Sequence, residues 1–219
     1  MLTKNKFSWF QLNTQIRCEE FNNFAENIES FLTNKVSEIE ADFEKRASQL
    51  TKDEQSEFFE MMFEEEYHNF SNSFPSLLRQ SLFLTVYAFF EQQLIGICKT
   101  FERQNQSIKL KDLKHKGITA AQFYLKRVVK LPFPDDTDLW IKIKSYSELR
   151  NHFAHNNKLS DKEVIASLHK IQGLKIDCIE HNKTTHISIE LQKEFILEFL
   201  DIIYEFLTLL NSISIEHKN

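Results

Sequence analysis

The residues best suited to chemistry in this chain lie in the segment RNHFAH, which runs from Arg150 to His155. It combines a permanently charged guanidinium, a carboxamide and an imidazole, the one side chain that exchanges protons readily near neutral pH. Attack of a ribose 2′-hydroxyl on its neighbouring phosphate needs proton transfer and stabilisation of a pentacoordinate, dianion-like state. Arginine and histidine could supply these two functions.

The spacing of the segment raises a geometric question. Asn151 and His155 are four residues apart and share a helix face, whereas Arg150 and His155 lie about 140° apart on an ideal helix. Joint action of Arg150 and His155 is therefore expected to need a distorted helix end, which Asn156 and Asn157 would allow, or a partner chain. In the alternative interpretation, Arg150 caps backbone carbonyls and His155 is an ordinary surface or core histidine.

The motif is short, so its chance frequency matters. An arginine followed five residues later by a histidine would arise by accident in roughly one chain in five of this composition, and requiring the asparagine lowers this to about one or two in a hundred. The helices around the motif must therefore support any functional interpretation.

The motif and its surroundings together resemble the HEPN family. RNHFAH has the R-N-x-x-x-H form of the R-x4-6-H signature of these helical domains, which occur in prokaryotic toxin-antitoxin and phage-defence systems and in some eukaryotic RNases. A long apolar segment, SLLRQSLFLTVYAFFEQQL, lies upstream, then a helix ends in SELRNHFAHNN, and a capped helix follows. The resemblance covers about Phe74 to Ser212 and leaves out the amino-terminal helices.

The resemblance implies an activity and roles for individual residues. Catalytic members of the family dimerise and cut RNA without a metal or cofactor. By this resemblance Arg150 would hold the scissile phosphate, His155 would act as general base or acid, and Asn151 would orient the phosphate or its partner. The chain would be a homodimeric endoribonuclease that leaves 2′,3′-cyclic phosphates, a toxin or defence effector with a possible cognate antitoxin or defence partner. Asn157 replaces a tyrosine that some toxin members carry as a modification target, so neutralisation through that residue is not expected.

Two further residues are auxiliary candidates. Glu91 is an acid in the most apolar predicted helix and could pair with Arg150 or another cation, although a surface carboxylate is the simpler interpretation. Lys158 adds a positive charge beside the motif. His152 stands at a position that the family leaves variable, and we expect no direct role for it.

A metal site is not predicted. Glu148, His152 and His155 could line one helix face, but no HExxH pattern and no second ligand cluster accompany them. Cys18, Cys98 and Cys178 are odd in number and lack metal-ligand spacing, which favours free thiols in a reduced cytoplasm. Nucleotide-binding loops would need glycines that this chain lacks.

The charge of the chain is unevenly distributed. The formal net charge is −5. From Glu38 to Glu66 eleven acidic residues face three basic ones, a balance of −8, and from Lys109 to Lys130 seven basic residues face one acid, a balance of +6. A solvated helix face explains the acidic stretch. The basic stretch could serve solubility or could bind a polyanion.

Composition and periodicity predict a single, mainly α-helical domain. Its 219 residues include three glycines, three prolines and 21 phenylalanines, which favour a helical bundle over a barrel or sandwich. Residues 1–72 are expected to form an acidic helical extension or arm of this domain. Helices are predicted over about 14–47, 76–104, 117–130 and 191–215, and a β-hairpin over 173–189. Three more helices are predicted from their caps: one from the Thr51-x-x-Glu54 capping box to about 70, one from Asp136 or Thr137 to His155, and one from the Ser160-x-x-Glu163 capping box to about 171.

The last predicted helix is apolar except for one narrow acidic stripe, so it should be central to the bundle or part of a dimer interface. No signal-peptide pattern and no run of eighteen apolar residues occurs, so we expect a soluble, cytoplasmic protein without a membrane partner. Two other functional classes stay open: a non-catalytic module that binds nucleotide or RNA, and an interaction protein that works through its acidic arm.

Overall fold

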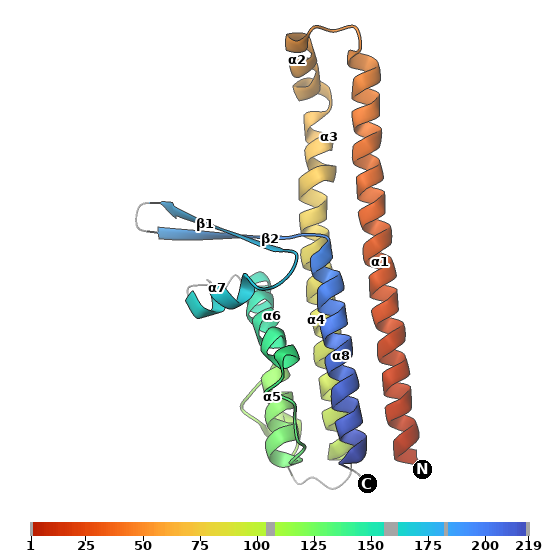
Figure 1. Ribbon diagram of the computed structural model, residues 1–219, viewed down its shortest axis with the longest axis vertical. Helices are drawn as coiled ribbons and strands as arrows, with labels where there is room; N and C mark the ends of the chain where they lie inside the picture. Colours follow the sequence, from red (N-terminus) through yellow and green to blue (C-terminus); the bar gives the residue numbers. More distant parts are fainter. Residues whose placement is uncertain (1, 104–107, 156–161, 182–183, 218–219) are drawn as a thin grey trace.

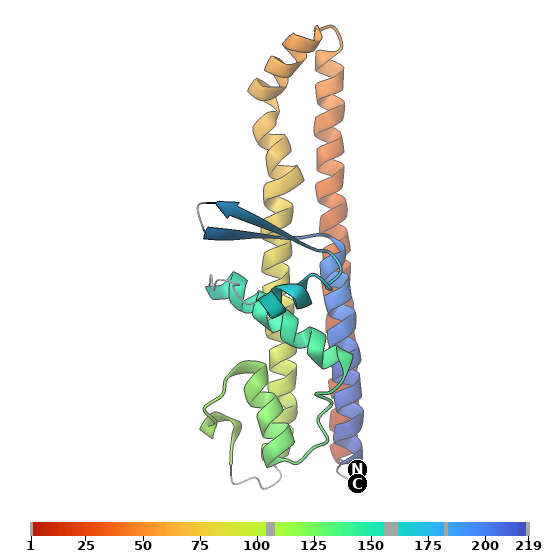
Figure 2. The same cartoon turned by 60° about the vertical axis from the view of Figure 1, so that its left-hand side comes forward.

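The computed structural model describes the chain except for residues 1, 104–107, 156–161, 182–183 and 218–219 (Figure 1). Helix α1 (Leu2–Ala47) runs beside a second long helical rod, and α2 (Lys52–Met62) joins them at the far end. Helix α8 (Glu194–Glu216) packs along the lower half of both rods, and both chain termini lie at that end (Figures 1 and 2). The predicted fold class, mainly α-helical with a small hairpin before the last helix, is confirmed.

Helix α1 begins about three turns earlier than predicted. The side chain of Phe10 packs against the core, and the hydroxyl of buried Thr14 donates to the Phe10 carbonyl at 2.9 Å. The hydrogen bond lies within α1, whereas the packing of Phe10 joins this segment, whose own sequence pattern is weak, to the rest of the bundle.

The second rod is continuous where the sequence predicted a new helix at Pro75. It contains α3 (Glu64–His68), a π-helical turn (Asn69–Ser73) and α4 (Phe74–Glu102), with Pro75 in the first turn of α4. The predicted start of this helix at about residue 76 is confirmed to within two residues, but no interruption precedes it. Proline lacks a backbone N–H and its ring crowds the preceding turn, and a wide π turn accommodates this without ending the helix. The predicted capping box of Thr51 and Glu54 at the start of α2 is confirmed.

The segment from α4 to α6 forms the other flank of the bundle. A single 3-10 turn (Leu110–Asp112) precedes α5 (Gly117–Phe123), which continues as a π-helical turn (Tyr124–Val128). Helix α6 (Asp138–His155) follows, and of the two predicted caps Thr137 is the one used: its hydroxyl accepts from the Trp140 N–H at 3.3 Å. Helix α7 spans Lys162–Leu168, and the Ser160 cap lies outside the described residues.

The predicted β-hairpin is confirmed. Strands β1 (Leu174–His181) and β2 (Thr184–Leu191) pair antiparallel, with Leu174 opposite Leu191 and His181 opposite Thr184. Arg79 of α4 attaches the inner end of the hairpin to the bundle. Its guanidinium donates to the Leu191 carbonyl at 3.0 Å and makes a bidentate ion pair with Glu29 of α1. One guanidinium thus joins α1, α4 and β2.

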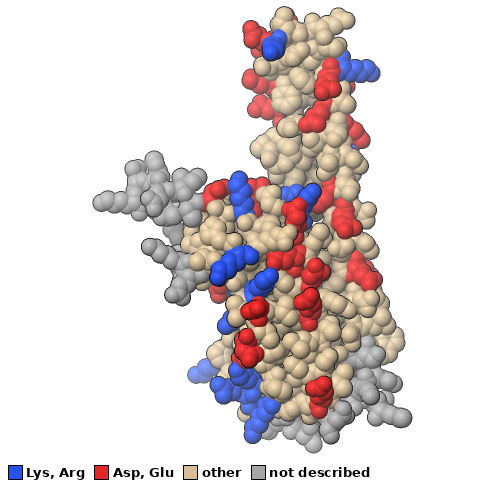
Figure 3. All heavy atoms as spheres, viewed as in Figure 1, with Lys and Arg blue, Asp and Glu red and all other residues tan. Residues whose placement is uncertain are grey.

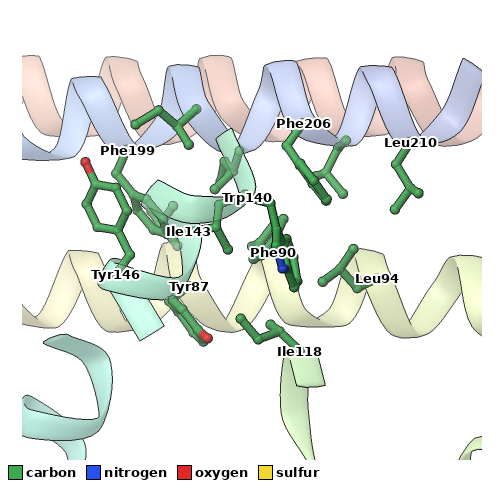
Figure 4. Packing of buried hydrophobic residues seen from close by; sticks show 14 of the residues in the cluster. Tyr87, Phe90, Leu94, Ile118, Trp140, Ile143, Tyr146, Phe199, Phe206 and Leu210 are labelled. Atoms are coloured by element: carbon green, nitrogen blue, oxygen red, sulfur yellow. The ribbon is translucent and has the colours of Figure 1, made fainter. Parts of the chain in front are cut away.

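The hydrophobic core lies where α4, α6 and α8 meet (Figure 4). The Phe83 ring of α4 contacts those of Phe195 and Phe199 of α8 at 5.2 Å each, and the Tyr146 ring of α6 lies 4.5 Å from that of Phe199. Farther down, Trp140 stacks on Phe206 at 5.1 Å. Fully buried rings therefore hold α6 along most of its length.

Of the two possibilities left open for the last helix, the central position is the one observed. Helices α1, α4 and α6 all pack on α8. Its Glu198, only 16% exposed, accepts from Lys142 Nζ at 3.0 Å, the Tyr146 hydroxyl at 3.3 Å and the Gln172 N–H at 2.7 Å. This carboxylate therefore fastens α6 to α8 and is not part of a solvated stripe.

One helical stretch among the described residues, Glu64–Glu102, is long and apolar enough to cross a membrane by length and composition alone. Within its most apolar window 44% of the residues are buried inside the bundle.

We call the bundle of α4, α5, α6, α8 and the first half of α1 the base, and the helical hairpin from Thr33 to Ser73 the arm. The first half of α1 belongs to the base because Cys18 and Ala25 lie in its core cluster. The arm extends well beyond the base (Figures 1 and 2), and acidic side chains are frequent on its surface (Figure 3).

Candidate functional site

Helix α6 holds the motif at a fixed orientation. Leu149, just before the motif, is fully buried, and the ring of Phe153 within it lies 6.2 Å from that of Phe83. Because these two residues face the core, Arg150 and Asn151 are left half-buried at the rim of the bundle and His155 is exposed. The apolar periodicity of the helix thus places the polar motif residues at the surface.

The three predicted catalytic residues meet within one chain. Arg150 Nη1 donates to Asn151 Oδ1 at 3.1 Å and lies 3.5 Å from His155 Nε2. The guanidinium is therefore placed between the carboxamide and the imidazole, near the carboxyl end of α6. The macrodipole makes that helix end favourable for cations.

The expectation that Arg150 and His155 could not act together without a distorted helix or a partner chain is wrong. The α-helix is regular through His155, and the contact forms within the chain. The 140° separation describes where side chains leave the helix, and it ignores how far they reach. His155 lies about 7.5 Å farther along the axis, and the long arginine side chain can extend along the helix surface to meet it.

Helix α4 contributes the second side of the site. Of the two interpretations of Glu91, the structure shows the less favoured one, a loose ion pair with Arg150 with 4.0 Å between Glu91 Oε2 and Arg150 Nη2. The two side chains are 22% and 32% exposed, so the pair is partly screened from water. At this distance the carboxylate steadies the guanidinium without a short hydrogen bond to it.

Tyr87 is a further residue of the site, and it was not singled out from the sequence. Its ring is buried, and the Arg150 guanidinium lies over it, 5.6 Å from the centroid. A cation held over an aromatic face is favoured electrostatically. The available signal was its position four residues before Glu91, which places both on the face of α4 that meets α6. Burial raises the pKa of Tyr87 to about 12, so its hydroxyl is neutral at physiological pH.

Gly117, the first residue of α5, closes the far side of Glu91. Its φ is +61°, and a Cβ placed there would lie 3.2 Å from Glu91 Oε1. Glycine is suited to the left-handed backbone and to the close approach of the carboxylate. The segment before α5 therefore reaches the edge of the Arg150 site.

The remaining candidates are placed as follows. The ring of His152 lies beside that of Phe153 at 5.4 Å and is half-buried. Lys158 lies outside the described residues. In the described part of the chain, no three His, Cys, Asp or Glu side chains are grouped as metal ligands would be. A hollow between α1 and α8, lined by Gln15, Cys18 and Tyr204 among others, does not include the motif.

Comparison of the chain with family models, curated proteins and solved structures gives no match.

Proposed function

We propose that this chain is a metal-independent endoribonuclease of HEPN type, acting in the cytoplasm as a homodimeric toxin or phage-defence effector. The observation that carries the proposal is the contact of one guanidinium, Arg150, with both Asn151 and His155 at the rim of a rigid bundle. An imidazole can transfer protons near neutral pH, and a cation beside it can stabilise the negative charge that grows on the phosphate.

The proposed mechanism follows from what each group can do. Either the neutral His155 imidazole takes the proton of the ribose 2′-hydroxyl as that oxygen attacks phosphorus and water protonates the leaving 5′-oxygen, or the imidazolium protonates the leaving 5′-oxygen and water takes the proton of the 2′-hydroxyl. Arg150 binds the phosphate oxygens whose negative charge grows in the pentacoordinate state. Asn151 holds the guanidinium from one side, and Tyr87 supports it from below. The products are a 2′,3′-cyclic phosphate and a 5′-hydroxyl.

The looseness of the site supports this role. The Arg150–His155 and Arg150–Glu91 contacts are 3.5 Å and 4.0 Å long, so neither is a strong, short hydrogen bond. A phosphate could replace them with shorter charge-assisted bonds. Exposure of His155 at the end of α6 suits a polymer, which passes over a surface, better than a small molecule, which is usually enclosed by a pocket.

Cleavage of single-stranded RNA in excess EDTA tests the proposal. Replacing Arg150 or His155 with alanine should lower the cleavage rate by about 100-fold or more, because each removes charge stabilisation or proton transfer. His152→Ala is the matched control, since it removes a histidine from the same helix end, and it should cut at close to the wild-type rate. Cleavage that persists in both Arg150→Ala and His155→Ala would refute the proposal.

The dimer has a separate test. Because Arg150 and His155 meet within one chain, co-expressed Arg150→Ala and His155→Ala chains should form mixed dimers that stay inactive. Recovered activity in such dimers would mean that the two residues of a working site come from different chains. Tight RNA binding without cleavage under any condition would instead favour the non-catalytic binding module.

A further inference from the structure

We propose that the basic loop, residues 109–116, and the ring of Phe123 form a binding surface for single-stranded RNA that continues from the Arg150 site. This inference rests on the proposed function, because it names where the flanking part of the same substrate is held. Its substrate is a single strand with accessible bases.

The basic loop lies beside the candidate site. The loop leads directly into Gly117, whose Cβ position would lie 3.2 Å from Glu91 Oε1, and Glu91 lies 4.0 Å from Arg150. Lys116, next in sequence to Gly117, is therefore close to the edge of the candidate site. A strand bound at Arg150 can reach the loop without crossing the bundle.

The basic loop carries exposed positive charge. Lys109, Lys111, Lys114 and Lys116 are all exposed, and basic side chains gather over α5 and the segment before it (Figure 3). Within the described residues, no carboxylate lies within 4.0 Å of the ammonium groups of Lys111, Lys114 and Lys116, whereas Lys126 on the following helix is paired with Asp135. The loop acid, Asp112, accepts a backbone N–H from Lys109 at 3.0 Å. These three lysines are therefore available to phosphates.

An exposed aromatic pair lies beside those lysines. Phe123 is 39% exposed, and its ring centroid lies 5.3 Å from that of exposed His115, at an interplanar angle of 42°. Water-exposed rings among basic side chains are the usual platform on which single-stranded bases stack. Phe123 lies about 9 Å along the helix from Gly117, so the rings and the Arg150 site could contact one short strand.

The loop is also held in place. The Leu110 N–H donates to Glu102 Oε1 of α4 at 2.5 Å, and the 3-10 turn packs on the same helix. Its lysines thus project from a fixed backbone next to the site. A preorganised surface loses less conformational entropy on binding than a free tail would.

The test measures RNA binding by the full-length His155→Ala chain with a fluorescein-labelled 12-nucleotide single strand. Adding Lys114→Ala and Lys116→Ala should weaken binding about tenfold and reduce the slope of log affinity against log salt by about 1.4, or 0.7 for each lost phosphate contact. Adding Phe123→Leu instead should weaken binding about fivefold with no change in that slope, because stacking is not ionic. Lys45→Ala with Lys52→Ala on the arm removes the same charge and should change neither quantity.

The outcomes separate this inference from the proposed function. If the wild-type chain cuts RNA in EDTA but the loop variants bind RNA as tightly as the arm control, the inference fails and the function stands. If the wild-type chain neither binds nor cuts RNA, both fail. If the loop variants lose binding to phosphatidylserine vesicles but still bind RNA as tightly as the His155→Ala chain, the surface binds a membrane and the inference is overturned.

Discussion

The base and the arm are built from the same helices, yet they differ in how each residue is surrounded. In the base, α6 and α8 are enclosed by several elements, and rings such as Phe83, Phe199 and Tyr146 have no exposed surface. In the arm, one helix packs on another, and few residues, Phe63 and Ile39 among them, are buried. The motif lies on the region with the deeper core, where its backbone is best fixed.

The arm compensates for its thin core with local interactions. The rings of Phe43, Phe58, Phe59 and Phe63 contact one another at 5.2 to 6.4 Å, and a capping box begins α2. Such contacts stabilise a hairpin without tying it to the base. We therefore expect the arm to open locally at a lower free energy than the base, and the chemistry not to depend on it.

Alkaline unfolding should affect the base most strongly. Burial raises the pKa of Tyr87 from about 10 to about 12. The stabilisation that its neutral hydroxyl gives the folded chain is therefore fully present below pH 10 and is lost as the pH rises through 12. The free energy of unfolding should fall by about 2 to 3 kcal/mol over this range from Tyr87 alone. Urea unfolding at several pH values measures it, and Tyr87→Phe should show a shallower decrease. An equal decrease in that variant would contradict the account.

Two helix caps allow the same substitution in both regions. Thr137 caps α6 in the base, and Thr51 caps α2 in the arm. Each Thr→Ala change should cost about 1 kcal/mol at its helix. Hydrogen exchange should show that Thr137→Ala lowers protection throughout the base, whereas Thr51→Ala lowers it in the arm only. Loss of protection in the base from Thr51→Ala would mean that the two regions unfold as one unit.

Removing the arm should have the smallest effect on cleavage. Phe31 of α1 faces Phe70 across the rods, with ring centroids 6.4 Å apart, so a short glycine-serine linker could join Lys35 to Asn69. We expect this shortened chain to cut RNA at the wild-type rate. Removing residues 1–70 is not equivalent, because the first half of α1 covers the core of the base. Lost cleavage in a folded, linker-joined chain would assign the arm a role in the reaction.

The sequence predicted what depends on short-range pattern. The helices, the Thr51 and Thr137 caps and the hairpin follow from periodicity and local hydrogen bonding. For Glu91 the sequence left pairing with Arg150 open but favoured a surface carboxylate. Three features needed the folded chain: the helix that continues through Pro75, the reach of Arg150 to His155, and the meeting of Tyr87 and Gly117 at the site. Each depends on side-chain extension or on contacts between distant segments, which spacing alone does not encode.

The central claim is that Arg150 and His155 drive attack by the ribose 2′-hydroxyl, and a substrate with one altered sugar tests it most directly. An RNA is first cut by the wild-type chain in excess EDTA to locate a cleavage position, and the same RNA is then made with a 2′-deoxynucleotide on the 5′ side of that bond. We predict a 2′,3′-cyclic phosphate on the normal substrate and no cut at the altered position. Cleavage at the deoxynucleotide, or products ending in a 3′-hydroxyl, would contradict the account.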